Sequence, residues 1–127
     1  MIHLDTSILI AVSDPSDAHV SFAKRLLSRG QPMAVSACVW SEFHSRPVDP
    51  LHAKVLARLL EGGIVSFDEA TARLAGELFY LTGSNRRTRM DAMIAATAIQ
   101  AGAELATANP GDFRPFVRFG LSVIPSK

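Results

Sequence analysis

The sequence contains a single cysteine, Cys38, so no disulfide can form within the chain. Chains without disulfides are typical of the reducing cytoplasm. None of the four histidines stands in an HxH or HExxH spacing, and with only one cysteine available this argues against a zinc site.

Long hydrophobic runs are also missing. No apolar stretch approaches the roughly 18–20 residues that a transmembrane helix needs. The N-terminus lacks the basic region of a signal peptide, and Asp5 interrupts the first apolar stretch. These absences predict a cytoplasmic protein with no membrane segment.

Aromatic residues and net charge are low as well. There are one Trp, one Tyr and seven Phe, and the formal net charge is +1. Few rings are therefore available for base stacking, which argues against sequence-specific reading of single-stranded nucleic acid. Hydrophobic residues, in contrast, make up 48% of the chain. We expect the surplus to form an interface with a second copy or a partner peptide.

Short apolar runs alternate with helical patterns along the chain. Strands are expected at residues 2–5, 32–36, 64–67, 104–107 and 121–124. Helices are expected from Ile8 with Thr6 and Ser7 as caps, over 17–29, from Ser36 to before Pro47, over 51–61, from Asp68 to about Leu81, and over 90–101. Residues 82–89 are expected to be a polar connection and 109–113 a turn.

This alternation predicts the fold class. Short strands that are apolar on both faces, separated by helices, are typical of a parallel sheet covered on both sides. The length suits one compact unit. We therefore predict a single domain over residues 1–127, with three α/β/α layers and a short, mostly parallel central sheet.

Two acidic residues follow strands of this predicted sheet. Asp5 lies in the apolar run LDTSILI, where an unpaired carboxylate costs several kcal/mol, on the order of 2–7. Asp112 follows the strand 104–107 in the turn NPGDF. Ligands of open α/β sheets bind at the carboxyl ends of the strands, so both residues are expected at the same edge.

Two further acids lie on predicted helices. Asp91 is in the first turn of its helix and shares a face with Ile94, Ala95 and Ala98. It could serve only to stabilise the helix start. Glu42 stands beside Phe43 on an apolar helix and could equally be a surface residue. Asp112 alone also fits an ordinary turn.

Asp5 fits a purely structural role worst, so we also consider a shared pocket. Four carboxylates in one pocket would repel one another and would require divalent cations. Ligand sets made of oxygen alone favour Mg²⁺ or Mn²⁺ over zinc. Such a site can bind a phosphodiester, activate a water molecule and stabilise the leaving oxygen.

The ordered set LDTSILI, Glu42, DAMIAATA and LATANPGDF resembles the PIN-domain nucleases. More narrowly, it resembles the VapC toxins of bacterial toxin–antitoxin pairs. The resemblance extends over almost the whole chain, and it implies an endoribonuclease that depends on Mg²⁺ or Mn²⁺.

The resemblance also implies roles for individual residues. The catalytic, metal-binding set would consist of Asp5, Glu42, Asp91 and Asp112. Asp5 and Asp91 would be direct metal ligands, and Asp112 would hold metal directly or through water. Glu42 would act on the attacking water. Thr107 and Asn109 match the family's T.N pattern and would orient the acids, and Ser7 would either do the same or cap a helix.

A cluster of arginines immediately precedes Asp91. Arg86, Arg87 and Arg89 would lie near the scissile phosphate if Asp91 holds the metal, since guanidinium groups pair well with phosphates. They also fit a solvated loop. Arg114 and Arg118, after Asp112, are weaker candidates of the same kind. A folded RNA recognised by shape, such as tRNA or rRNA, would suit this composition.

Three other functions were considered. A receiver-type signalling domain would need paired acids after the first strand and a late lysine after a strand, and LATANP supplies none. A phosphatase of the haloacid-dehalogenase type would need an acid where Ser7 stands. A catalytically silent nucleic-acid-binding module of the same fold remains the main alternative.

The resemblance finally implies partners. VapC-like proteins usually form homodimers and are silenced by a small VapB-like antitoxin that covers an apolar groove. The high hydrophobic content agrees with such an interface. The sequence does not identify the RNA target.

Overall fold

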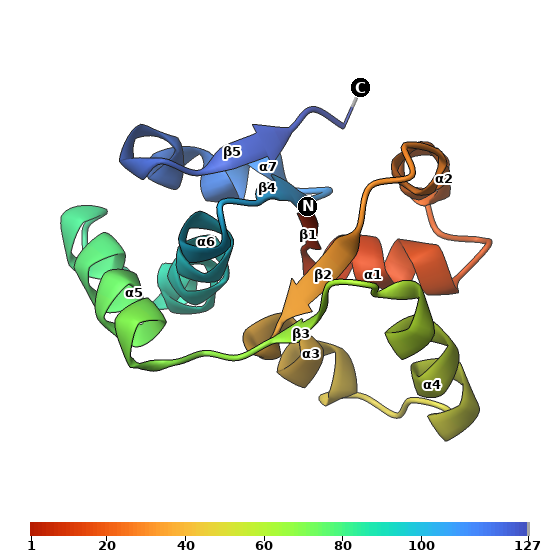
Figure 1. The fold of residues 1–127 in the computed structure, drawn as a ribbon. Helices are drawn as coiled ribbons and strands as arrows, with labels where there is room; N and C mark the ends of the chain where they lie inside the picture. The colour runs from red at the N-terminus through yellow and green to blue at the C-terminus, as the bar shows by residue number, and fades with distance from the viewer. Residues whose placement is uncertain (127) are drawn as a thin grey trace.

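A central sheet of five short strands organises the chain (Figure 1). The structure, a computed structural model, describes residues 1–126. The strands are β1 (Ile2–Leu4), β2 (Met33–Ser36), β3 (Gly63–Val65), β4 (Glu104–Ala106) and β5 (Ser122–Ile124). Their order across the sheet is β3-β2-β1-β4-β5, and every pairing is parallel.

Helices occupy the connections between the strands. They are α1 (Thr6–Ser13), α2 (Val20–Ser28), α3 (Ala37–His44), α4 (Pro50–Leu59), α5 (Glu69–Leu81), α6 (Arg89–Ala101) and α7 (Pro110–Phe113), with the 3-10 helices η1 (Arg86–Thr88) and η2 (Arg114–Phe119). In Figure 1, α5 and α6 lie on one side of the sheet, and α1, α2 and α4 lie on the other. The predicted three-layer, parallel α/β class is therefore confirmed.

The sheet forms the centre of the hydrophobic core, and helices contribute its outer parts. The largest fully buried apolar side chains come from both and are Ile2, Leu4, Ile8, Leu9, Val35, Val39, Leu78, Leu105, Phe113 and Phe116. β1 is buried at every position, as expected of a strand covered on both faces. No helix within residues 1–126 is both long and apolar enough to span a bilayer.

Some predicted boundaries are wrong. The first helix begins at Thr6 rather than Ile8, and its cap is Asp5, whose side chain accepts a hydrogen bond from the Thr6 N–H. Thr6 and Ser7 therefore do not cap it, because the carboxylate one residue earlier takes that place. The strand expected at 64–67 is Gly63–Val65, and the helix expected at 17–29 begins at Val20.

The segment after β4 differs most from expectation. Residues 109–113, expected to be a turn, contain the short helix α7, and η2 follows directly. Pro110 and Pro115 stand in the first turn of each helix, where the missing N–H costs no hydrogen bond. Phe113 and Phe116 anchor both helices in the core. This arrangement places Asp112 in a helix that begins just beyond β4.

Candidate active site

Asp5 lies at the carboxyl end of the central strand and is only 7% exposed. Its Oδ1 accepts a 2.8 Å hydrogen bond from the Thr6 N–H. Its Oδ2 accepts bonds from the Thr107 hydroxyl at 2.8 Å and the Ser7 hydroxyl at 3.3 Å. These donors offset part of the cost of burying the carboxylate. Burial nevertheless affects the pKa of Asp5 more than these hydrogen bonds do, so the pKa is raised. The negative charge of Asp112 raises it slightly further.

The two hydroxyls that contact Asp5 also connect two strand ends. Thr107 is fully buried, and its Oγ1 accepts a 3.0 Å bond from the Asn109 N–H. The Ser7 hydroxyl accepts a 3.1 Å bond from the Ala108 N–H. The segment after β4 is thereby fixed to the start of α1. Asn109 takes part through its backbone, and within residues 1–126 its side chain makes no hydrogen bond to an acid.

Glu42 is half-buried on α3 and is oriented by Thr6, which was expected only to cap the first helix. The Thr6 hydroxyl donates a 2.7 Å hydrogen bond to Glu42 Oε1. The position of Thr6 next to Asp5 in LDTSILI was the only signal for this role. Thr6 therefore holds Glu42 next to the segment that carries Asp5.

Asp91 lies half-buried in the first turn of α6. Its pKa is raised from 3.8 to about 6, first by burial and then by the negative charges of Asp112, Asp5 and Glu42. Each of the other three acids thus acts on Asp91. Asp112 itself is exposed on α7. The fold brings together, at one edge of the sheet, the four acids selected from the sequence.

The four carboxylates do not converge into a finished ligand cage. Within residues 1–126, no three His, Cys, Asp or Glu side chains are close enough together to form a metal-binding group. Like charges that share one edge repel one another, so a spread arrangement is expected where no cation lies between them. The donor set contains oxygen alone and carries excess negative charge, so it fits a hard divalent cation such as Mg²⁺ or Mn²⁺.

The arginines before Asp91 are all exposed. Arg86 and Arg87 belong to η1, which is capped by the Asn85 side chain. The Arg89 guanidinium lies 4.1 Å from the centroid of the Phe79 ring on α5. A cation–π contact of this kind directs Arg89 toward α5, whereas Arg86 and Arg87 remain free to approach a ligand.

Comparison with known proteins gives the family. The model of the PIN domain matches residues 2–116. The chain therefore belongs to the PIN-domain family, as its resemblance to these nucleases predicted. No curated protein matches the sequence.

Several solved structures share the fold. FitAcB from Neisseria gonorrhoeae is 22% identical, with a TM-score of 0.76 and coverage of 99% of this chain and 98% of that one. A toxin–antitoxin complex from Klebsiella pneumoniae is 25% identical, with a TM-score of 0.73 and coverage of 100% and 98%. VapC20 of Mycobacterium tuberculosis, a toxin that cleaves the sarcin–ricin loop, is 24% identical, with a TM-score of 0.70 and coverage of 95% and 96%.

Proposed function

We propose that this chain is the toxin of a toxin–antitoxin pair and acts as a metal-dependent endoribonuclease on structured RNA, such as tRNA or rRNA. The observation that carries the proposal is the placement of Asp5, Glu42, Asp91 and Asp112 at one sheet edge, where the pKa of Asp91 is raised first by burial and then by the charges of the other three acids. The PIN-domain match supports phosphodiester hydrolysis at that edge. The whole of residues 1–127 would act as one domain.

The acids would divide the work. Asp5 and Asp91 would hold Mg²⁺ or Mn²⁺, and Asp112 would complete the site directly or through water. When bound, the ion supplies a Lewis acid for the phosphoryl oxygens and lowers the pKa of a bound water.

Glu42 would act on the attacking water. Because the Thr6 hydroxyl engages Glu42 Oε1, the other carboxylate oxygen is available to accept a proton from that water. Thr107 and Ser7 keep both oxygens of Asp5 in fixed directions. Arg86 and Arg87 would neutralise phosphates of the substrate near Asp91, whereas Arg89, at the start of α6, stacks on Phe79 of α5.

Similarity to a Klebsiella toxin–antitoxin complex supports a VapB-like antitoxin as partner. As the resemblance to VapC toxins implies, the chain would form a homodimer and act in the cytoplasm. The exposed apolar side chains of α4, Leu51, Val55 and Leu59, show that the molecule has apolar surface for a partner to cover.

The test is cleavage of total RNA by the purified, antitoxin-free chain with Mg²⁺ or Mn²⁺. We expect discrete fragments that disappear with EDTA and in Asp91→Asn, with a loss of about 100-fold or more because losing even an outer-sphere partner of a metal ligand costs about 10–100-fold. Glu77→Gln is the matched control, because it removes one exposed carboxylate from α5 and should cleave as the wild type does.

Two outcomes would contradict the proposal. Cleavage that Asp91→Asn retains in full would exclude the acidic site. Intact RNA together with Mn²⁺ binding would favour the silent RNA-binding module instead.

A further inference from the structure

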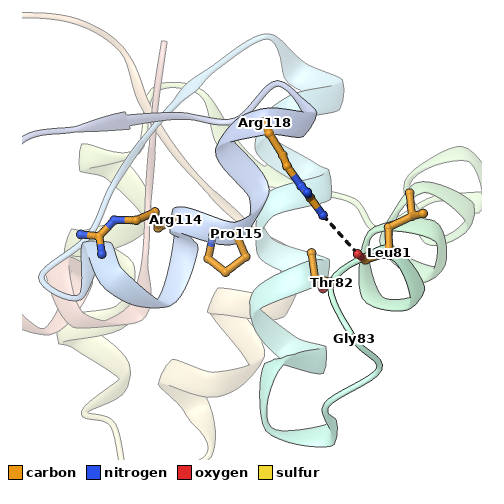
Figure 2. Close-up of a pocket in the computed structure, with 6 residues that line it drawn as sticks. All are labelled: Leu81, Thr82, Gly83, Arg114, Pro115 and Arg118. Atoms are coloured by element: carbon orange, nitrogen blue, oxygen red, sulfur yellow. Dashed lines mark hydrogen bonds between the residues drawn. The ribbon is translucent and has the colours of Figure 1, made fainter.

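A cavity of about 570 Å³ lies between the end of α5 and the 3-10 helix η2. Its lining consists of Leu81, Thr82, Gly83, Arg114, Pro115 and Arg118 (Figure 2). The two walls are far apart in the sequence, since residues 81–83 end one helix and residues 114–118 follow α7. None of the functions described above uses this cavity.

The lining carries positive charge and no acid. The ion pairs within residues 1–126 are formed by Arg29 and Arg73, so neither arginine of the cavity is neutralised by a carboxylate. The Arg114 side chain makes no hydrogen bond within the described part of the chain. Arg118 donates only a long bond of 3.4 Å to the Leu81 carbonyl. Most of their N–H donors are therefore free for an anionic ligand.

The arginines are held in different ways. The Arg118 guanidinium lies 4.7 Å from the centroid of the Phe119 ring, and its bond to Leu81 spans the cavity. Figure 2 shows Arg114 extending from the opposite side of Pro115, away from Leu81. Two guanidinium groups placed apart in this way suit two anionic groups of one extended ligand better than one free phosphate.

Both walls of the cavity are connected through the chain to segments that carry the acids. Arg114 follows α7, which carries Asp112, so the two sites share one continuous segment. On the other wall, Thr82 and Gly83 lead through η1 into α6, which begins with Arg89 and carries Asp91. The segments that form the cavity are therefore chain neighbours of the segments that carry Asp91 and Asp112.

We propose that this cavity binds the sugar–phosphate backbone of the RNA strand on one side of the cleavage site, with Arg114 and Arg118 each pairing with a phosphate. Arginine forks match phosphate geometry and give bidentate bonds. Exposed Leu81 and Pro115 offer an apolar surface to the intervening sugar or base. The proposal rests on the proposed ribonuclease function and assigns the path of its substrate.

Binding of a fluorescein-labelled 12-nucleotide single-stranded RNA of mixed sequence, measured by anisotropy in EDTA, tests this path without cleavage. We expect Arg114→Gln and Arg118→Gln each to weaken binding about tenfold, as loss of a charge-assisted hydrogen bond implies. The double variant should reduce the slope of log affinity against log salt by about 1.4, at about 0.7 for each lost phosphate contact.

Arg58→Gln is the matched control, because it removes one exposed arginine from α4, on the far side of the sheet (Figure 1). It should change neither affinity nor slope. Equal weakening by Arg58→Gln would overturn the proposal, since only overall charge would then matter. Absence of RNA binding by the wild type would overturn the proposal as well. So would full displacement of the RNA by inorganic phosphate, at phosphate concentrations where Arg58→Gln and the wild type still bind RNA alike.

The same variants separate this proposal from the proposed function. In the total-RNA assay, the double variant should need more enzyme for the same cleavage, because a contact remote from the reacting atoms mainly changes KM. Cleavage by wild type with unchanged binding by the double variant would overturn the cavity alone. Arginine-dependent binding without any cleavage by wild type would support the cavity and overturn the nuclease.

Discussion

Asp5 shows how a buried carboxylate is held in this fold. Its oxygens accept bonds from the Thr6 N–H and the hydroxyls of Ser7 and Thr107, yet its pKa is still raised because burial outweighs them. The hydrogen bonds therefore orient the group more than they stabilise its charge. A side chain kept in so unfavourable a place is typical of a functional site.

Thr107→Val tests that orientation. The substitution nearly preserves shape but removes the buried donor to Asp5 Oδ2. We expect Mn²⁺ affinity, measured by calorimetry, to fall about 10–100-fold, as for other outer partners of metal ligands.

Thr97→Val is the control for Thr107→Val. Thr97 is equally buried, but its hydroxyl donates to the Met93 carbonyl of its own helix. Its removal should leave Mn²⁺ binding unchanged. If both variants lose affinity alike, general loosening of the core rather than the bond to Asp5 is responsible.

Asp91→Asn should stabilise the metal-free protein while it abolishes activity. The pKa of Asp91 is 3.8 unperturbed and about 6 in the folded state. With respect to Asp91, the fold is therefore most stable below pH 4, where Asp91 is protonated, and it loses this stability as the pH rises through 6 and Asp91 ionises. At pH 7 the variant should gain about 1–2 kcal/mol in free energy of unfolding, after allowance for solvent screening of a half-exposed group.

The measurement for Asp91→Asn is urea unfolding in EDTA at pH 4, 5, 6 and 7. The gain should be near zero at pH 4 and grow toward pH 7. A constant difference across these pH values would show that neither burial nor repulsion among the acids raises the pKa of Asp91 in the folded protein.

At the scale of single elements, replacing either of two glycines with alanine is expected to change the stability in opposite directions. Gly76 lies exposed on α5, and an added Cβ would meet nothing within 4 Å, so Gly76→Ala should stabilise by about 0.5–1 kcal/mol. At Gly62 an added Cβ would lie 2.9 Å from Ala34 Cβ and 3.1 Å from the Met33 carbonyl. Gly62→Ala should therefore destabilise the protein by about 1–3 kcal/mol.

Thermal unfolding of both alanine variants at one pH checks this pair. The melting temperatures should move in opposite directions from that of the wild type. A lower value for Gly76→Ala would mean that another chain packs closely on this face of α5, where an added methyl group would clash.

The elements that the sequence predicted well are those with strong periodicity or clear caps. The helix from Asp68 to Leu81 is α5 almost to the residue, because the Asp68 side chain caps it. The start of α1 was wrong because LDTS offers three competing capping side chains. α7 was missed because NPGDF is typical of a turn, and no element was predicted where η2 follows; buried Phe113 and Phe116 anchor both as helices.

The candidate site was predictable only in part. All four acids were visible in the sequence, since each stands where a carboxylate is unusual or follows a strand. The bond from Thr6 to Glu42 joins residues 36 positions apart, and no local pattern indicates such a contact. The cavity next to η2 was equally hidden, because its walls come from separate segments.

At the scale of the whole molecule, the acids bring distant segments together. Asp5, Glu42, Asp91 and Asp112 come from the start of α1, from α3, from α6 and from α7. A cation held by several of them should stabilise the entire fold, by about 2.7 kcal/mol at a concentration 100 times its dissociation constant.

Differential scanning fluorimetry with MgCl₂ or MnCl₂ tests this effect. The melting temperature of the wild type should rise by about 4 °C for each kcal/mol. Asp91→Asn should respond much less, and Glu77→Gln should respond as the wild type does. An equal rise in all three would show a general salt effect.

The strand order has a consequence for the protein while it is being made. β1 is synthesised before the other four strands, but it lies in the middle of the sheet, and its neighbour β4 is synthesised only after β2 and β3. Thr107, the buried partner of Asp5, follows it by 102 residues, and Asp112 comes later still. A polypeptide that ends before Asp112 therefore lacks the complete set of acids, and we expect such a product to have no nuclease activity.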